Sequence, residues 1–323
     1  MPVITVIGVT ETFSGVVWAA DAVLVTGATG AQGGAVVDAL LAAGRPVRAL
    51  VRNPDSAAAR RLAERGVELR QGSFEDSEAV AAAVRGANGV FSMQLPPRPD
   101  APDSEQRAAR ILVDSAVAAG VRAFVHTSVA RADEHEQFIG WHEGRWWPLY
   151  WTSKAAANEA VRSSALTSWT ILKPAFMMDN FVVPKANSMF PGLAAGEIVT
   201  AMRPETRLDL IAASDIGRVA AAALCAPERF DRQEIDLAAE SSTMSEVAAA
   251  IAGVTNSPVS ARHLEPHQAV AAGARQGVVE SQVWASVEGY KVDLDRAARR
   301  GFDLRSFADW ALEHESRFVV GDH

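Results

Sequence analysis

The chain has 323 residues, of which 49% are hydrophobic, and it carries 31 Lys and Arg against 39 Asp and Glu, for a net charge of -8. This length suits one large α/β domain, or one domain with a small lobe. The excess of acid argues against a nucleic-acid partner, and no apolar run approaches the length of a membrane span. The single cysteine, Cys225, excludes an intrachain disulfide and a multi-cysteine metal site. Its alanine-rich surroundings predict a buried, unreactive thiol.

Residues 1–20 form an N-terminal extension whose structure the sequence leaves open. An apolar run occupies residues 3–9, but no positively charged region precedes it and no clear cleavage site of small residues follows. A signal peptide is therefore not expected, and we predict a cytoplasmic protein. The extension fits an added strand, a flexible arm or an extension at the translation start.

The glycine-rich stretch 23–34, VLVTGATGAQGG, is the first chemical signal in the chain. An apolar run that suits a buried strand ends here, a glycine-rich turn follows, and a helix of Ala, Val and Leu begins. Such a crossing holds a pyrophosphate on backbone N–H groups at the helix N-terminus. We predict cofactor contacts at Gly27, Thr29, Gly30, Ala31, Gln32 and Gly33. The alternative is a turn that merely connects strand to helix.

Strand and helix patterns alternate from residue 21 to about residue 172. The predicted strands are Ala22–Thr26, Pro46–Val51, Val67–Arg70, Gly89–Met93, Ala123–Thr127 and Trp169–Leu172. The predicted helices are Ala31–Ala43, Ser56–Arg65, Ser77–Val84, Ser104–Ala119 and Ser153–Ser163. This alternation predicts right-handed βαβ crossovers, and hence a Rossmann-type α/β domain with a doubly wound parallel sheet over residues 21–175.

The second half of the chain is less regular. Prolines and glycines interrupt residues 180–204, which we expect to be rich in loops. A helix is predicted at 215–225 and strands at 234–237 and 259–263, and Thr243 and Glu246 match a capping box for a helix over 247–252. We therefore predict a smaller C-terminal α/β substrate lobe over 176–323, with a segment at about 206–225 returning to the Rossmann domain.

Arg52 directly follows the second predicted strand, where this fold faces the adenosine ribose. An acid there would accept a hydrogen bond from the 2′-hydroxyl and favour NAD, whereas a guanidinium matches a 2′-phosphate. We therefore expect NADP(H), with Asn53 as an added hydrogen-bonding group and Arg48 as a second cation. The alternative is that Arg52 is one solvated charge among many.

Tyr150 and Lys154 form a Tyr-x-x-x-Lys pair at the start of a predicted helix. Residues four apart share a helix face, and an ammonium beside a phenol lowers the phenol's pKa. The tyrosine can then give a proton to a carbonyl that receives hydride. Ser128, at the end of the fifth predicted strand, is placed to hydrogen-bond the same oxygen. We predict these three residues as catalytic, with Lys154 also binding the nicotinamide ribose. A surface pair is the alternative.

Four tryptophans crowd residues 141–151, an interval that also holds two histidines. The tryptophans suit a pocket or lid for a planar ligand, but equally the packing of a long surface loop or a subunit contact. The histidines lack the spacing of metal ligands, so we predict no metal.

The chain resembles the NmrA-like group of the atypical short-chain dehydrogenases/reductases from about residue 22 to residue 259. Three segments carry the resemblance: GATGAQGG at 27–34, LKPAFMMDN at 172–180 and SDIGRV at 214–219. The first is similar to the group's phosphate loop and the second to the segment that passes the nicotinamide. The third is similar to a structural helix. The chain departs from the group at Ser73, where an acid is usual, and at Lys173, where arginine is usual.

The resemblance implies further cofactor contacts beyond the glycine-rich turn. We predict them at Ser73 and Phe74 near the adenine, at Met93 and Gln94 after the fourth strand, and at Pro174 and Phe176 near the nicotinamide.

The resemblance implies an NADPH-dependent reductase of a carbonyl or quinone-like small molecule. Other members of the group bind the dinucleotide and act as redox-sensing regulators, which is the alternative that we retain. An epimerase or dehydratase would need tightly held NAD, against which Arg52 argues. A homodimer through exposed helices is an assembly that this scaffold permits.

Overall fold

The computed structural model describes residues 22–321, so the predicted N-terminal extension at 1–20 lies outside the described residues. The described chain divides into two compact units. The first unit holds residues 22–135, 147–173 and 213–236, and the second holds residues 136–146, 174–212 and 237–321.

A seven-stranded sheet forms the centre of the first unit. Its strands in chain order are β1 (Val23–Val25), β2 (Val47–Val51), β3 (Glu68–Gln71), β4 (Gly89–Ser92), β5 (Ala123–Thr127), β6 (Trp169–Pro174) and β10 (Gln233–Leu237). They lie in the spatial order β10-β6-β5-β4-β1-β2-β3. The ladders from β3 to β6 are parallel. Strand β10 runs the same way, because backbone bonds join Arg232 to Trp169 and Ala175 to Leu237.

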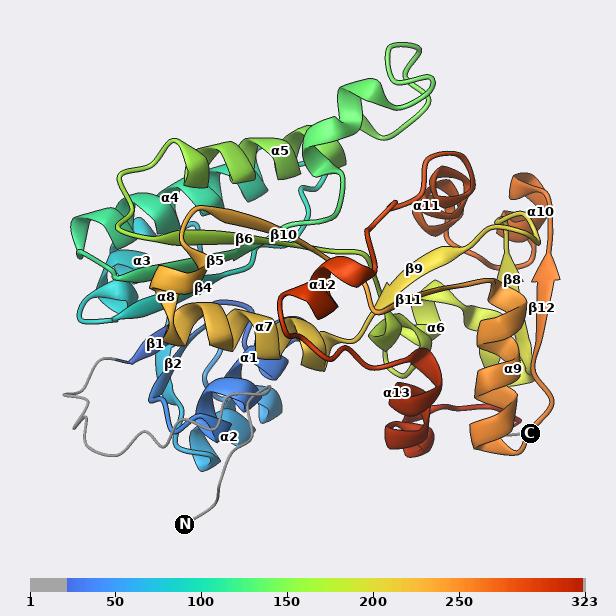
Figure 1. Cartoon of the computed structure of the whole chain (residues 1–323), viewed down its shortest axis with the longest axis horizontal. Coiled ribbons are helices and arrows are strands. Elements are labelled where there is room, and N and C mark those ends of the chain that lie inside the picture. The colour runs from blue at the N-terminus through green and yellow to red at the C-terminus, as the bar shows by residue number, and fades with distance from the viewer. Residues whose placement is uncertain (1–21, 322–323) are drawn as a thin grey trace. The chain divides into compact units, whose positions relative to one another are not determined.

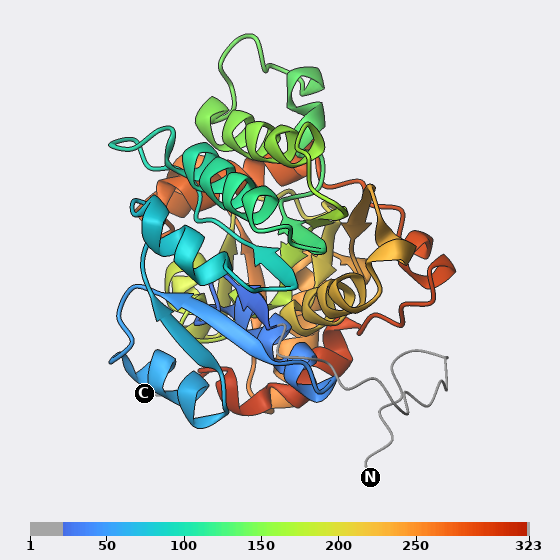
Figure 2. The ribbon, with the colours of Figure 1, turned by 90° about the vertical axis from the view of Figure 1, so that its left-hand side faces the viewer.

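Helices cover both faces of this sheet. On one face lie α1 (Ala31–Ala42), α2 (Ala57–Glu64) and α7 (Ala213–Cys225), and on the other lie α3 (Ser77–Val84), α4 (Ser104–Ala118) and α5 (Pro148–Arg162) (Figure 1). Figure 2 shows α3, α4 and α5 side by side. Fully buried Leu24, Val90, Leu112, Phe124 and Ile171 belong to the core beneath them. The predicted doubly wound α/β fold is confirmed.

The second unit contains two small sheets. One consists of β7 (Phe176–Met177), β9 (Leu208–Ile211) and β11 (Glu240–Ser242), and the other pairs β8 (Glu197–Thr200) with β12 (Ser260–His263). Its α-helices are α6 (Ala186–Met189), α9 (Met244–Thr255), α10 (Pro266–Ala271), α11 (Gln276–Val287), α12 (Asp295–Arg299) and α13 (Phe307–Glu313). The predicted capping box of α9 is present: Thr243 accepts from the Glu246 N–H, and the Glu246 side chain accepts from Thr243.

The structure differs from the sequence prediction at several places. Helix α5 begins at Pro148 rather than at Ser153, because proline suits the first turn of a helix. The segment that belongs to the first unit is 213–236 rather than 206–225, since the unpredicted strand β9 lies in the second unit. Residues 136–146, which we expected in the Rossmann domain, cluster with the second unit. Cys225 is exposed rather than buried, although partial desolvation still raises the pKa of its thiol.

Candidate active site

The glycine-rich turn joins β1 to the N-terminus of α1 in the first unit. Gly27 has a φ of 66°, a left-handed conformation that L-residues with a side chain rarely adopt. A Cβ on Gly33 would overlap the carbonyl of Gly27, so helix and turn meet only because Gly33 has no side chain. Gly30 caps α1 without a side-chain hydrogen bond, and the first helical turn carries no acidic residue. The N–H groups of this turn thus face no competing carboxylate from their own helix.

Side-chain hydrogen bonds tie this turn to the neighbouring strands. Thr26 Oγ1 accepts from the Met93 N–H at 2.7 Å and lies 3.0 Å from the Met93 carbonyl oxygen, joining the ends of β1 and β4. Thr127 Oγ1, at the end of β5, donates to Gln32 Oε1 at 2.9 Å. The carboxyl ends of three adjacent strands are thereby fixed around the first turn of α1.

Arg52 and Arg48 have different environments at the next strand. Arg52 is exposed after β2, and no ion pair to it is found among residues 22–321. Arg48 is buried, bonds Glu68 at 2.8 Å and donates to the Ala83 and Arg85 carbonyls. The expectation of Arg48 as a second cofactor cation is therefore wrong, because its guanidinium is already engaged. The Asn53 carboxamide oxygen accepts from the Asp55 N–H at 2.9 Å.

Ser73 and Phe74 follow β3. Both are partly buried, and Phe74 packs against the core of the first unit. A hydrogen bond from Ser73 is the largest factor that lowers the pKa of Glu75. Glu75 thus lies two residues after Ser73, the position at which the NmrA-like pattern has an acid.

Lys154 is buried on α5 and forms an ion pair with Glu105 on α4. Its Nζ lies 2.5 Å from Glu105 Oε1, and the two residues are 7% and 1% exposed. Sequence reasoning missed Glu105. The helical pattern could have revealed it, because Glu105 lies on the same buried face of α4 as Ala108, Ala109 and Leu112. A charged residue in an apolar stripe requires a partner.

Buried polar atoms without partners gather where β4 and β5 end. Gln94 Nε2 donates to Ser92 Oγ at 2.9 Å, and Ser92 Oγ lies 3.1 Å from His126 Nδ1. Gln94 Oε1, His126 Nε2 and Ser128 Oγ have no hydrogen-bond partner among the described residues. Buried polar atoms are normally satisfied, so these three atoms point to a ligand or ordered water at this end of the sheet. Burial lowers the pKa of His126 to about 3, which keeps its ring neutral.

Tyr150 lies in the first turn of α5 beside two tryptophans. Its ring stacks on Trp147 at 6.2 Å and meets the edge of Trp151 at 5.1 Å, and the Lys154 ammonium lies 5.9 Å from its centroid. The predicted pair therefore shares one helix face. The ammonium, however, makes its hydrogen bond to Glu105.

The tryptophans of 141–151 mostly pack within their own units. Trp151 is buried in the first unit, whereas Trp146 is buried in the second, where its Nε1 donates to the Ile139 carbonyl at 2.9 Å. Trp147 is the exposed one, at 43%. Trp146 and Trp151 therefore serve packing. No cluster of side chains suited to hold a metal ion is found among residues 22–321.

Two predicted cofactor residues, Pro174 and Phe176, are assigned to the second unit. Phe176 packs against Phe181 and Phe190, with ring centroids 5.8 and 6.3 Å away. It lines a narrow apolar pocket. The other lining residues are Met189, Phe190, Met202, Leu208, Val278, Ser281, Gln282, Ala285 and Tyr290.

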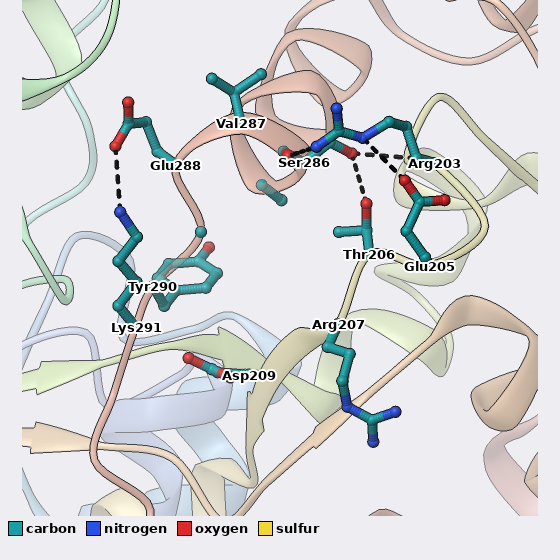
Figure 3. Close-up of a pocket in the computed structure, with 12 residues that line it drawn as sticks. Arg203, Glu205, Thr206, Arg207, Asp209, Ser286, Val287, Glu288, Tyr290 and Lys291 are labelled. Carbon is teal, nitrogen blue, oxygen red and sulfur yellow. Dashed lines mark hydrogen bonds and ion pairs between the residues drawn. The ribbon is translucent and has the colours of Figure 1, made fainter.

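A larger pocket of about 290 Å³ adjoins the apolar one in the second unit (Figure 3). The two share Ala285 and Tyr290. Charged residues line the larger pocket, and several are paired in Figure 3, where Lys291 meets Glu288 and Arg203 meets Glu205. Burial, and then the charge of Asp209, raise the pKa of Tyr290 far above its ordinary value, so its phenol remains protonated. Sequence reasoning missed Tyr290, although the chain has only 2 tyrosines.

The residues of the first unit fit a dinucleotide. The glycine turn has N–H groups with no carboxylate in the first turn of α1 beside them, and Arg52 is an exposed cation. The strand ends carry the buried, unpartnered atoms of Gln94 and Ser128. These features lie along the carboxyl ends of the parallel strands, where ligands bind in folds of this type.

Comparison with known proteins agrees with this geometry. Residues 19–298 match the NmrA-like family. The (4-alkanoyl-5-oxo-2,5-dihydrofuran-3-yl)methyl phosphate reductase of Streptomyces griseus is 31% identical over 308 residues, which cover 92% of this chain and 99% of that protein. The NAD(P)H azoreductase of Xenophilus azovorans is 30% identical over 311 residues, covering 92% and 99%.

Among solved structures, the triphenylmethane reductase of Citrobacter sp., complexed with NADP(H), has the same fold. The TM-score is 0.73 at 22% identity, and the match covers 91% of this chain and 99% of that one. The described residues include no helix with the length and apolar character that crossing a bilayer requires.

Proposed function

The chain belongs to the NmrA-like family, and from this premise we propose that it is an NADPH-dependent oxidoreductase that transfers hydride to a carbonyl or quinone-like small molecule. Both full-length relatives named above are reductases, and the name of one specifies NAD(P)H. The acceptor in the other name is a furanone, which is a carbonyl compound.

The observation that carries the proposal is the coincidence of two features at one edge of the sheet. The open N-terminus of α1 follows β1, and the unpartnered atoms of Gln94 and Ser128 follow β4 and β5, two strands on one side of β1. A turn that merely connected strand to helix would not explain buried polar atoms left unsatisfied beside it. A bound dinucleotide explains both.

Each residue then has a role. The N–H groups of the glycine turn bind the pyrophosphate, and Arg52 binds the 2′-phosphate. Lys154 orients the nicotinamide ribose, while Ser128 hydrogen-bonds the acceptor's oxygen and Tyr150 donates a proton to it. Bound NADPH supplies the hydride.

The wide pocket of the second unit, of about 290 Å³, is a further candidate site for a small molecule. The hydroxyl of Tyr290 borders it, remains protonated and is a hydrogen-bond donor to a carbonyl. Tyr290 is thus a second candidate residue to test.

The test is NADPH oxidation by the purified full chain with quinones, conjugated furanones, aldehydes and azo compounds as acceptors. Tyr150→Phe is expected to lower turnover by about 10²–10⁴-fold, the usual contribution of general acid catalysis, with NADPH affinity nearly intact. Lys154→Ala is expected to lower both turnover and affinity. Lys185→Ala, an exposed lysine outside the candidate site, is the matched control.

The outcomes separate the proposal from its alternative. Unchanged turnover in Tyr150→Phe would reject its role and direct the test to Tyr290→Phe. Tight NADPH binding without turnover on any acceptor would favour the redox-sensing regulator. Failure of the wild-type chain to bind NADPH would reject the proposal.

The remaining predictions belong to the same proposal. Tyr150 and Lys154 support membership of the short-chain dehydrogenase/reductase superfamily, and the net charge of -8 supports the absence of a nucleic-acid partner. The cytoplasmic location and the homodimer stay predictions from the sequence.

A further inference from the structure

The buried ion pair between Lys154 and Glu105 is not accounted for by the roles assigned above. It joins the first turn of α4 to α5, two helices that lie side by side on one face of the sheet (Figure 2). Both side chains are almost completely removed from solvent. A buried ion pair is often no more stabilising than apolar side chains of similar size, because desolvation offsets the attraction. Packing alone therefore does not explain these two residues.

The geometry leaves part of the ammonium available. A lysine ammonium has three N–H donors, and within residues 22–321 the hydrogen bond that Lys154 makes is to Glu105. Two donors thus remain for a ligand. A long side chain with four rotatable bonds is otherwise poorly fixed, and the contact to Glu105 holds its end in one place.

The surroundings make Glu105 the counter-charge of Lys154. Burial raises the pKa of Glu105, and the charge of Lys154 opposes that effect. The N-terminus of α4 also favours a carboxylate in its first turn. From α5, Tyr150 and Ser153 adjoin the pair. From β5, His126 faces it as a neutral ring near pH 7, because burial lowers the pKa of His126 to about 3. Asp133, which also acts on His126, is bonded to Lys173 and Arg162.

We propose that Glu105 is a positioning residue for the cofactor: its carboxylate holds the Lys154 ammonium in place, so that the two remaining N–H groups bind the ribose hydroxyls of NADPH. This inference rests on the proposed function. It assigns no contact between Glu105 and the cofactor, since Glu105 acts through Lys154.

The experiment measures the dissociation constant of NADPH for the full chain at pH 7.5, by the fluorescence of NADPH. In Glu105→Gln the ammonium has lost the carboxylate that fixes its position, and we expect binding about tenfold weaker than wild type. In a Lys154→Ala background the same substitution is expected to weaken binding no further, because Glu105 acts through Lys154. Glu105→Asp keeps the charge and is expected to restore part of the lost affinity.

Asp103→Asn is the matched control, because Asp103 caps the same helix but pairs with exposed Arg107. It is expected to match wild type throughout. A folded Glu105→Gln with wild-type affinity would overturn the inference, and so would an equal further loss of affinity in the Lys154→Ala background. If Glu105→Gln does not fold, Glu105→Asp decides, since the shorter side chain misplaces the ammonium. Weaker binding that is absent in the Lys154→Ala background then supports the inference, and wild-type binding overturns it. Failure of wild type to bind NADPH would instead count against the proposed function.

Discussion

Arg52 is the residue to which we assign the preference for NADP(H). It is exposed at the end of β2, while Arg48 on the same strand is engaged with Glu68 and two carbonyls. If Arg52 binds the 2′-phosphate as proposed, Arg52→Ala removes a charge-assisted contact, which contributes about 1.5–3 kcal/mol. We expect NADPH affinity to fall about 10–100-fold. NADH affinity is expected to be unchanged, because NADH lacks that phosphate.

Titration of both cofactors against wild type, Arg52→Ala and Arg110→Ala checks this expectation. Arg110 is an exposed arginine on α4, on the face of the sheet opposite α1. Equal losses for NADPH and NADH in Arg52→Ala would show that the arginine acts on something other than the 2′-phosphate.

At the residue scale, the sequence predicts arrangements that depend on local spacing. The glycine turn and the shared helix face of Tyr150 and Lys154 are of this kind, since a turn or one helix face brings their members together. Glu105 and Tyr290 could not be predicted in this way because tertiary packing determines their surroundings. Glu105 meets a lysine 49 positions away, and Tyr290, in the loop after α11, meets the charge of Asp209 on β9. The prediction for Arg48 was wrong for the same reason, because its partners Ala83 and Arg85 lie 35 and 37 positions later in the chain.

At the element scale, the close contact of α1 with α7 requires a residue without a side chain at Gly217. A Cβ on Gly217 of α7 would lie 2.5 Å from the backbone carbonyl of Ala35 in α1. Gly217→Ala therefore forces the helices apart. Overpacking of this kind costs about 1–3 kcal/mol, against about 1 kcal/mol gained in helix propensity. We expect the free energy of unfolding to fall.

Urea denaturation measures the effect, with Gly253→Ala as the control. Gly253 lies in α9, and a Cβ there meets nothing within 4 Å. The same substitution should raise the free energy of unfolding by about 0.4–1 kcal/mol at this site. Stabilisation by both variants would contradict the close packing of α1 on α7.

The elements of the first unit were more predictable than those of the second. Repeated crossovers make the central strands of the first unit largely apolar and give its helices an apolar stripe, so β5 and α3 have the predicted bounds. In the second unit, strands such as β8 and β9 are four residues long and lie among prolines and glycines. Their sequence periodicity is too short to separate a strand from a loop.

At the scale of the whole molecule, four charged residues form a network of ion pairs at one edge of the first unit's sheet. Asp133 bonds Lys173 and Arg162 at 2.5 and 2.8 Å, and Glu234 pairs with the same two cations. The participants come from α5, β6, β10 and the 3-10 turn at Ala132–Gln137. Substitution of Lys173 for the arginine usual in this family thus preserves a cation at the centre of the network.

This network gives the protein a stability that depends on pH. Burial opposes ionisation of Asp133 and Glu234, but hydrogen bonds from Lys173 and Arg162 outweigh it, so both pKa values lie below the ordinary 3.8 and 4.5. A carboxyl whose pKa is depressed on folding stabilises the folded state above its unfolded pKa, and that stability is lost as pH falls through the folded pKa. We therefore expect the free energy of unfolding to be level above about pH 5 and to decline below about pH 4.5.

Urea denaturation of wild type and Lys173→Met at pH 7, 5, 4 and 3 checks this. Removing one charged partner of the half-buried carboxyls costs about 1–3 kcal/mol at pH 7. The variant's curve should also be flatter in acid, because the pKa values of Asp133 and Glu234 return towards their ordinary range. Arg98→Met removes an exposed ion pair with Asp100 and should leave the curve unchanged, since solvent screens such pairs. An equally steep acid decline in Lys173→Met would place the origin of the pH dependence outside this network.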